Sequence, residues 1–310
     1  MQFIEVKALQ GVLVARTRAT AADTNAGRIG DRHACARNVA QFGAQLRGDL
    51  VGGQFAIGER LSALMIAAYL ESQEVKASAV NAATVIATDA VFGNATPLMD
   101  ETRKRATEVL GPLFAQNVIP VVTGFNASTL DGRPTTLGRG GSDFSASILA
   151  GALEAEELWI WTDVDGIMSA DPRLVPSARV LDTITYAEAA ELAYAGAKVL
   201  HPRTLAPLVE RGIPVWSKNS FKPEVPGTRI VPTIDIQGGP RAVTSMKDVA
   251  MVTIEPLGNA ISSARLMAEA MHALDAADVE LLAITSSSYR QNFCFLIKQA
   301  ELDQIGRAHV

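Results

Sequence analysis

Residues 118–161 read VIPVVTGFNASTLDGRPTTLGRGGSDFSASILAGALEAEELWIW, and their order of patterns decides the fold class. A short apolar run at 118–122 is typical of a strand. A loop rich in glycine and threonine follows, then a helical pattern from about 143 to 153, then the apolar run 158–161. Strand, helix and strand in succession predict an α/β fold whose neighbouring strands run parallel.

The sequence on both sides of this stretch repeats the alternation of strand and helix patterns. Leu61, Leu64, Met65 and Ala68 form an i, i+3, i+4, i+7 stripe, which predicts an amphipathic helix over 59–73. The remaining expected strands are 75–80 and 213–216, and the remaining expected helices are 101–116, 186–194 and 204–211. We therefore expect a mostly parallel sheet covered by helices on both faces.

The N-terminal segment 1–57 shows no sustained period, apart from a possible strand at 11–15. Prolines then mark a linker at 233–248. Beyond it, 249–255, 262–275, 279–285 and 293–297 have the patterns of strand, helix, strand and strand, as in a partial ferredoxin-like module over 249–310. The sequence thus predicts domains at 58–232 and 249–310.

The bulk composition excludes several classes of protein. Of the 310 residues, 48% are hydrophobic and 20% charged, enough apolar side chains for a real core. The formal charge of −5 lacks the basic footprint of a nucleic-acid binder. No apolar run is long enough to span a membrane. The two cysteines, Cys35 and Cys294, form no disulfide framework or zinc motif, which favours the cytoplasm.

A glycine-rich run at 135–143 ends at a predicted helix. Glycines let backbone approach a ligand, and free N–H groups at a helix start attract anions. Arg139 adds a guanidinium whose fork suits a carboxylate or phosphate. Ser142 is a candidate N-cap of the helix. The alternative is a plain glycine turn capped by serine.

Two further groups of residues could bind a ligand, one after a predicted strand and one after the predicted helix 186–194. Asp163 and Asp165 follow the run 158–161, where carboxylates could hold a ribose or Mg²⁺, or could simply belong to an exposed Asp-Gly turn. Lys198 could contact phosphate or be a solvated lysine at a helix end. His201 precedes a proline at a helix start and is expected to cap that helix. The chain has neither a G-x-x-x-x-G-K-[ST] loop nor G-x-G-x-x-G.

Together these motifs resemble the aspartate kinase family. The matching runs stand in order: GERLSA (58–63), GF (124–125), TLGRGGSDFSA (136–146), WTDVDGIMSADPR (161–173), YAEAAELAYAGAKVLHP (186–202) and PGTRI (226–230). The resemblance implies the amino-acid kinase fold, a three-layer α/β sandwich, followed by a truncated ACT-type regulatory module. It also implies transfer of the γ-phosphate of ATP to the side chain of L-aspartate, with Mg²⁺.

The resemblance carries roles to particular residues. Glu59 would meet the ammonium of aspartate and Arg139 a carboxylate, while Asp143, with Ser142 beside it, would organise the reacting centre. The ATP side would be lined by Thr162, Asp163, Arg173, Lys198 and Val199. A homo-oligomer is expected, with lysine or threonine as effector at the ACT module and without nucleic-acid or membrane partners.

The sequence departs from the family at two places. The family opens with K-F-G-G-T-S, whose lysine and glycines embrace the transferred phosphate, and residues 1–57 contain no such run. Lys7 lacks the neighbouring glycines, so that role is not assigned to it. Met168 stands where an aromatic residue is common. Two alternatives follow: another amino-acid kinase acting on acetylglutamate, glutamate or UMP, or a non-catalytic protein that senses amino acids.

Overall fold

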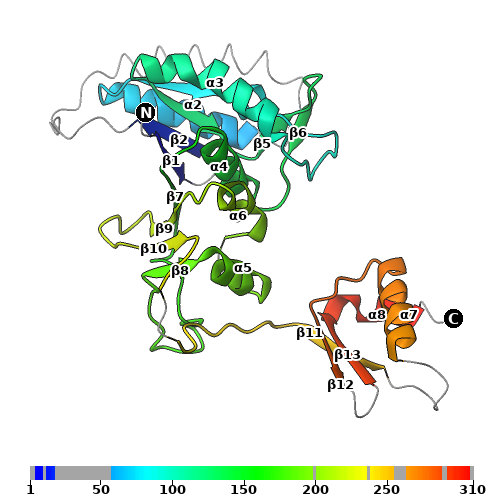
Figure 1. Cartoon of the computed structure of the whole chain (residues 1–310). Coiled ribbons are helices and arrows are strands. Elements are labelled where there is room, and N and C mark those ends of the chain that lie inside the picture. Colours follow the sequence, from blue (N-terminus) through cyan, green and yellow to red (C-terminus); the bar gives the residue numbers. More distant parts are fainter. Residues whose placement is uncertain are drawn as a thin grey trace. The chain divides into compact units, whose positions relative to one another are not determined.

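The computed structural model describes residues 4–9, 12–17, 57–197, 200–235, 238–254, 263–287 and 292–307 (Figure 1). The chain divides into two compact units, Met1–Thr244 and Ser245–Val310, each with its own hydrophobic core. None of the helices in these ranges is long and apolar enough to cross a membrane.

The first unit is built on an eight-stranded mixed sheet. In spatial order its strands are β3 (Ala77–Val80), β4 (Ile119–Thr123), β2 (Val12–Thr17), β1 (Ile4–Leu9), β7 (Glu157–Thr162), β9 (Val215–Asn219), β10 (Thr228–Val231) and β8 (Thr183–Thr185). Four neighbouring pairs are parallel and three, β4–β2, β2–β1 and β9–β10, are antiparallel. The mostly parallel sheet predicted from the sequence is confirmed.

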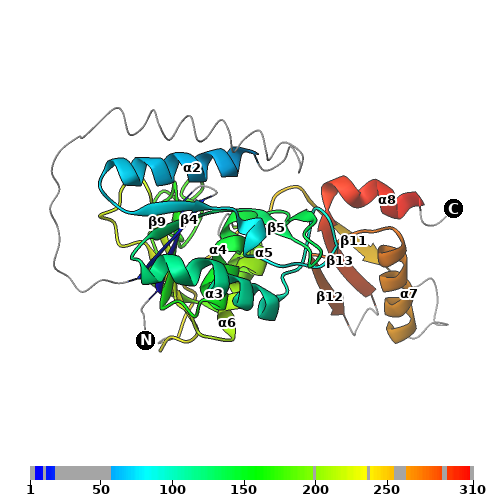
Figure 2. The same cartoon turned by 90° about the horizontal axis from the view of Figure 1, so that it is seen from above.

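Helices cover both faces of this sheet. They are α2 (Ile57–Ser72), α3 (Met99–Ala115), α4 (Gly141–Ala152), α5 (Tyr186–Tyr194) and α6 (Pro202–Val209), with a short 3₁₀ turn η2 (Ala82–Thr84). Val121 of β4 packs in the cluster beneath α2, whereas the next residue, Val122, packs with α3 and α4. Alternating residues of one strand thus meet opposite layers, and Figure 2 shows α2 and α3 on opposite sides of the sheet.

The buried face of α2 differs from the predicted stripe. Ala63 and Ala67 are the buried positions, packed with Ala77 and Val121, while Met65 of the stripe is 65% exposed. Apolar residues occur all round this helix, so periodicity alone could not select the face. Small alanines face the sheet, where helix and strands approach closely.

The N-terminal strands occupy the middle of the sheet. The possible strand at 11–15 is found as β2, while β1 was not predicted. β1 pairs in parallel with β7 and antiparallel with β2. The rest of the segment 1–57, up to residue 56, lies outside the described residues.

The second unit carries the predicted order of strand, helix, strand and strand. Its elements are β11 (Val249–Ile254), α7 (Ser263–Ala276), β12 (Ala283–Ser287), β13 (Asn292–Lys298), the turn η3 (Gln299–Glu301) and α8 (Leu302–Arg307). The antiparallel sheet has the order β11-β13-β12, so the strand that follows α7 is not the neighbour of β11. This split arrangement matches the β-α-β-β part of a ferredoxin-like β-α-β-β-α-β unit.

Candidate active site

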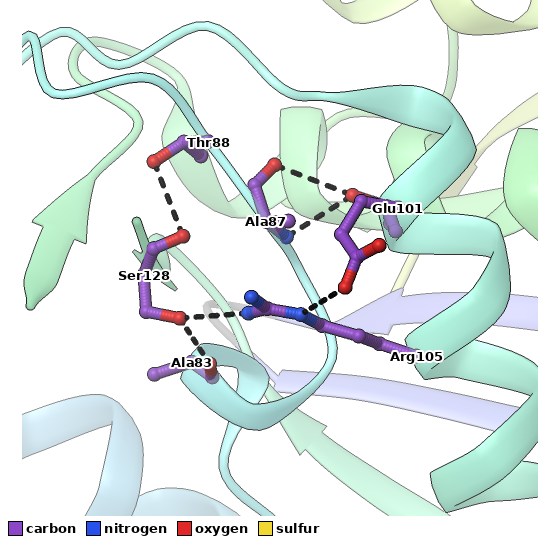
Figure 3. Close-up of polar contacts among 7 residues, drawn as sticks. Ala83, Ala87, Thr88, Glu101, Arg105 and Ser128 are labelled. Atoms are coloured by element: carbon purple, nitrogen blue, oxygen red, sulfur yellow. Dashed lines mark hydrogen bonds and ion pairs between the residues drawn. The ribbon is translucent and has the colours of Figure 1, made fainter. Parts of the chain in front are cut away.

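A hairpin of β5 (Asn126–Ser128) and β6 (Pro134–Thr136) leads into the glycine-rich loop, and a polar network anchors it (Figure 3). The hydroxyl of Ser128 donates to the carbonyl of Ala83 at 2.7 Å and accepts from Arg105 Nη1 at 3.0 Å. Arg105 also pairs with Glu101 on α3 at 3.2 Å. Because these groups come from α3, η2 and β5, the base of the hairpin is fixed on two sides.

The loop itself is held by close packing of its glycines. Gly138 and Gly140 have φ of 74° and 68°, the left-handed region. A Cβ at Gly138 would lie 2.7 Å from Asn94 Oδ1, and one at Gly141 would lie 2.6 Å from Phe125 Cδ2. The loop therefore needs glycine for both conformation and space.

The loop ends at the start of α4, two positions earlier than expected. Gly140 is the N-cap, and Ser142 lies inside the first turn, so the interpretation of Ser142 as the cap is wrong. The left-handed glycine makes the turn by its own conformation, and no side chain caps this helix start. The amide of Gly141 donates to the carbonyl of Gly138 at 3.0 Å, whereas the amides of Ser142 and Asp143 have no such partner in the described chain and can meet a ligand.

A second helix start stands beside this loop. His201 is the N-cap of α6, and its Nδ1 accepts from the amide of Arg203 at 3.3 Å, which confirms the capping role expected for it. A Cβ at Gly140 would lie 3.2 Å from His201 Cβ. Burial, followed by the charges of Arg203 and Arg139, lowers the pKa of His201, which keeps the ring neutral near pH 7.

Arg203 braces the loop from the side of α6. Its guanidinium donates to Asn94 Oδ1 and, at 3.2 Å, to the carbonyl of Ala95, and lies 4.8 Å from the ring centre of Phe144. Asn94 is the residue that would clash with a Cβ at Gly138. Arg203 was not identified from the sequence, since its hydrogen-bond acceptors lie more than 100 residues away in the chain.

Two of the predicted charged residues meet at this loop without partners. Arg139 is exposed, and Asp143, in the first turn of α4, is half-buried. Within the described ranges neither forms a hydrogen bond or an ion pair. Burial raises the pKa of Asp143, since water is withdrawn from its carboxylate. A guanidinium and a carboxyl group thus stand free at one helix start.

Phe125 packs against the end of the same loop, at Gly141. It has a φ of 67°, which is rare outside glycine, and its amide donates to Ser145 Oγ at 2.9 Å. The same hydroxyl donates to the carbonyl of Gly141 at 2.8 Å. Backbone strain of this kind is common at functional sites.

Glu59, the residue predicted to bind the ammonium group, lies half-buried in the first turn of α2. No described contact joins it to the glycine-rich loop.

The predicted nucleotide residues follow β7. Thr162 is the last residue of that strand and donates to Asp163, which is exposed. Arg173 makes a two-point ion pair with Asp171, with contacts of 2.9 and 2.6 Å, which raises the pKa of Arg173. Lys198 and Val199 lie outside the described residues. No group of three histidine, cysteine or acidic side chains suited to a metal ion occurs in the described ranges.

The segment 219–228 holds this loop at several points. Ser220 donates to the carbonyl of Thr162 from both its amide (2.8 Å) and its hydroxyl (3.0 Å). Asp165 accepts from Asn219 at 2.5 Å and from Lys222 at 3.1 Å. The hydrogen bond from Asn219, and next the one from Lys222, hold the pKa of Asp165 below its ordinary range. Sequence analysis missed these ties, because each spans more than 50 residues.

Comparison with known proteins places these features in a family. The amino acid kinase family model matches residues 19–219, a range that begins inside the segment without recognisable motifs. The bifunctional aspartokinase/homoserine dehydrogenase of Haemophilus influenzae is 35% identical over 248 residues, 79% of this chain and 30% of that protein. The lysine-sensitive aspartokinase 3 of Escherichia coli is 37% identical over 230 residues, 74% of this chain and 51% of that protein. The chain thus spans about half or less of these relatives.

Solved structures agree with the sequence relatives. Escherichia coli aspartokinase III in complex with lysine and aspartate superposes with a TM-score of 0.67 and 33% identity, over 81% of this chain and 57% of that one. The complex of the same enzyme with aspartate and ADP has a TM-score of 0.64 and 32% identity, over 86% and 60%. The predicted amino-acid kinase fold is confirmed, and this chain belongs to the amino acid kinase family.

Proposed function

We propose that this chain is the catalytic part of an aspartokinase, which transfers the γ-phosphate of ATP to the side-chain carboxylate of L-aspartate. One observation carries the proposal: Arg139 and Asp143, which have no hydrogen-bond or ion-pair partner among the described residues, stand at the start of α4, where the N-cap Gly140 has no side chain. The relatives that match over most of the chain are aspartokinases, and one of them was solved with aspartate and ADP.

The substrate side has the charges that an amino acid needs. The fork of Arg139 suits a carboxylate, and the free amides of α4 add donors at the same place. Glu59 is assigned to the ammonium group. The side chain of aspartate, with a reference pKa of about 3.9, is already ionised at neutral pH. No general base is therefore required, and the work of the site is alignment.

Asp143 is assigned as an organiser of cations. Burial raises the pKa of its carboxyl, so its ionised form is disfavoured until a cation arrives. Phosphoryl transfer depends on positioning and on neutralising charge at the phosphate oxygens. A carboxylate that gains a partner only when the site fills suits that task.

The nucleotide is assigned to the loop after β7. Thr162 and the exposed Asp163 have oxygens that could bind a ribose. Lys198 and Val199 are assigned to the same ATP site because they lie in a motif that resembles the family's. Arg173 can meet phosphate only by exchanging or sharing its ion pair with Asp171. Mg²⁺ would take its oxygen ligands mainly from the phosphates, as is usual for this ion, since the described residues form no cluster suited to a metal ion.

The second unit is assigned as an ACT-type regulatory module. Its split order of strands supports this assignment, as does the likeness to an aspartokinase solved with lysine. We assign lysine or threonine as the effector, a homo-oligomer as the assembly and the cytoplasm as the compartment.

A hydroxamate assay tests the activity. Aspartyl phosphate formed from ATP, Mg²⁺ and aspartate is trapped by hydroxylamine, and a signal that requires aspartate is expected. Glutamate, acetylglutamate and UMP, compared by release of ADP, should give none. Absence of an aspartate-dependent signal would contradict the proposal. Thermal stabilisation by lysine or threonine but not by ATP with Mg²⁺ would favour a sensor instead.

A further inference from the structure

A buried lysine stands behind the loop that follows β7. Lys218 of β9 is 9% exposed, and its Nζ donates to the carbonyls of Val225 at 3.1 Å and Pro226 at 2.8 Å. An ammonium group is costly to bury, so it must be fully engaged where it lies. Two carbonyls account for two of its three donors.

Aromatic rings surround the same ammonium group. Its Nζ lies 5.3, 5.7 and 5.8 Å from the ring centres of Trp159, Trp161 and Trp216, within the range of cation–π attraction. Trp159 is paired with Trp216, and Trp161 with Lys218, in the parallel register of β7 and β9. These three are the only tryptophans in the sequence.

From Lys218 the contacts lead to the loop in short steps. Val225 and Pro226 precede Gly227, which has a φ of 82° and would place a Cβ 2.2 Å from the carbonyl oxygen of Ser217. The next residue, the fully buried Thr228, accepts a hydrogen bond at 2.8 Å from the amide of Ile167. Lys218 therefore fixes the turn from which Thr228 holds the loop.

The loop after β7 is packed tightly against Thr228 at Gly166. Gly166, with a φ of 142°, lies so close to Thr228 that a Cβ would be 2.7 Å from its Oγ1. Gly166 and Ile167 belong to the run 162–173 assigned to the nucleotide. A displacement of the turn at 225–227 would therefore move this loop directly.

We propose that Lys218, held between the three tryptophans, is a positioning residue that sets the nucleotide loop through the turn 225–227 and Thr228. The identity of the ligand as a nucleotide rests on the proposed function. Lys218 acts through the turn and does not touch the substrate, so its loss should affect the nucleotide side and spare the aspartate side.

The test substitutes Lys218→Met, which keeps an apolar stem and removes the ammonium group. Lys104→Met, at an exposed lysine of α3, is the matched control. Amide exchange over 162–168 should rise about tenfold in Lys218→Met, because the tie to Thr228 loosens. The KM for ATP should rise about tenfold, with the KM for aspartate changed less than about twofold. Lys104→Met should match the wild type in all three.

Several outcomes decide the matter. Unchanged exchange in a folded Lys218→Met protein would overturn the proposal, and so would an equal rise of both KM values. If that variant does not fold, Thr228→Val removes only the hydrogen bond from the amide of Ile167 to Thr228. It must then raise the KM for ATP and leave the KM for aspartate nearly unchanged. If the wild type shows no aspartate-dependent transfer, the proposed function fails by itself. Exchange over 162–168 and calorimetric binding of ADP then decide the role of Lys218.

Discussion

The two loops of the candidate site are held in place by opposite means. The loop before α4 is fixed by shape: left-handed glycines pack against Asn94 and Phe125, and its charged residues make no bonds with the described chain. The loop after β7 is fixed largely by polar ties, and these engage Asp165 with Lys222 and Arg173 with Asp171. Packing leaves the charged side chain of Arg139 available to a ligand, whereas the charged side chains after β7 are already paired with other residues of the protein.

This difference indicates which side of the site is ready for its ligand. A guanidinium without a described partner, beside the amides of Ser142 and Asp143, needs little rearrangement to take a carboxylate, so the proposed substrate side would be preorganised. On the proposed nucleotide side, a phosphate would have to compete with Asp171 for Arg173. We therefore expect substitutions before α4 to alter binding of aspartate, and substitutions after β7 to alter the position of a loop.

Arg139→Ala should give the largest effect on kcat/KM for aspartate, and it tests the contrast between the loop before α4 and the loop after β7. Loss of a charged partner for a carboxylate costs about 2–5 kcal/mol, so kcat/KM for aspartate should fall by about thirtyfold to several thousandfold. Arg139→Lys keeps the charge but loses the fork, and should recover only part of the rate. Steady-state kinetics with calorimetry of ADP would measure this. A weaker affinity for ADP in Arg139→Ala would contradict the separation of the two sides.

Gly138→Ala should break the packing of the first loop. A left-handed alanine costs about 1–2 kcal/mol, and contact with Asn94 Oδ1 at 2.7 Å adds to that cost. We expect a loss of about 2 kcal/mol or more in the free energy of unfolding.

Gly132→Ala is the matched control for that variant. Gly132 is also left-handed, with a φ of 82°, but has open space around it, so only about 1 kcal/mol should be lost there. Denaturant titration compares the two variants. Equal losses would show that packing does not hold the loop.

The same contrast explains what the sequence could predict. The helix at 186–194 was predicted at its true bounds, and in the structure Thr185 and Glu188 form a capping box at its start, a local signal that the sequence itself contains. The strands β5, β6, β8 and β10 have only three or four residues each and were missed. Such short strands are set by their neighbours in the fold and leave little local pattern.

The candidate site was predictable to the extent that it lies in contiguous runs. Arg139, Asp143 and Asp163 stand in motifs beside glycines, so they could be named from the chain alone. Their roles stay predictions. Lys218 and Thr228 act through contacts between distant segments, and only the alternation of Trp216 with Lys218 along β9 hinted that the lysine shares the face of an aromatic residue.

Asp143→Asn should raise stability at neutral pH while it removes activity. The folded pKa of Asp143 is raised, so burying its carboxyl costs nothing below the unfolded pKa of about 3.9 and becomes costly as the pH rises. The melting temperature should rise by about 2 °C at pH 7, and the gain should fade toward pH 4. Asp163→Asn, at an exposed aspartate, should change the melting temperature little. A gain that persists at pH 4 would contradict this account.

Asp165→Asn should give the smallest effect, because the ties of Asp165 lie at the surface, where ion pairs contribute little. The pKa of Asp165 is lowered in the fold, so its tie is fully present above the ordinary value of about 3.9 and is lost as the pH falls through the lower pKa of the folded state. Tryptophan emission should therefore shift on acidification in the wild type and less in Asp165→Asn. Lys222→Ala removes the other partner of the ion pair and should behave in the same way. If both variants follow the wild-type titration, the surface ion pair of Asp165 contributes nothing to the position of the loop after β7, and the ties made by Ser220, Thr228 and Lys218 suffice to hold it.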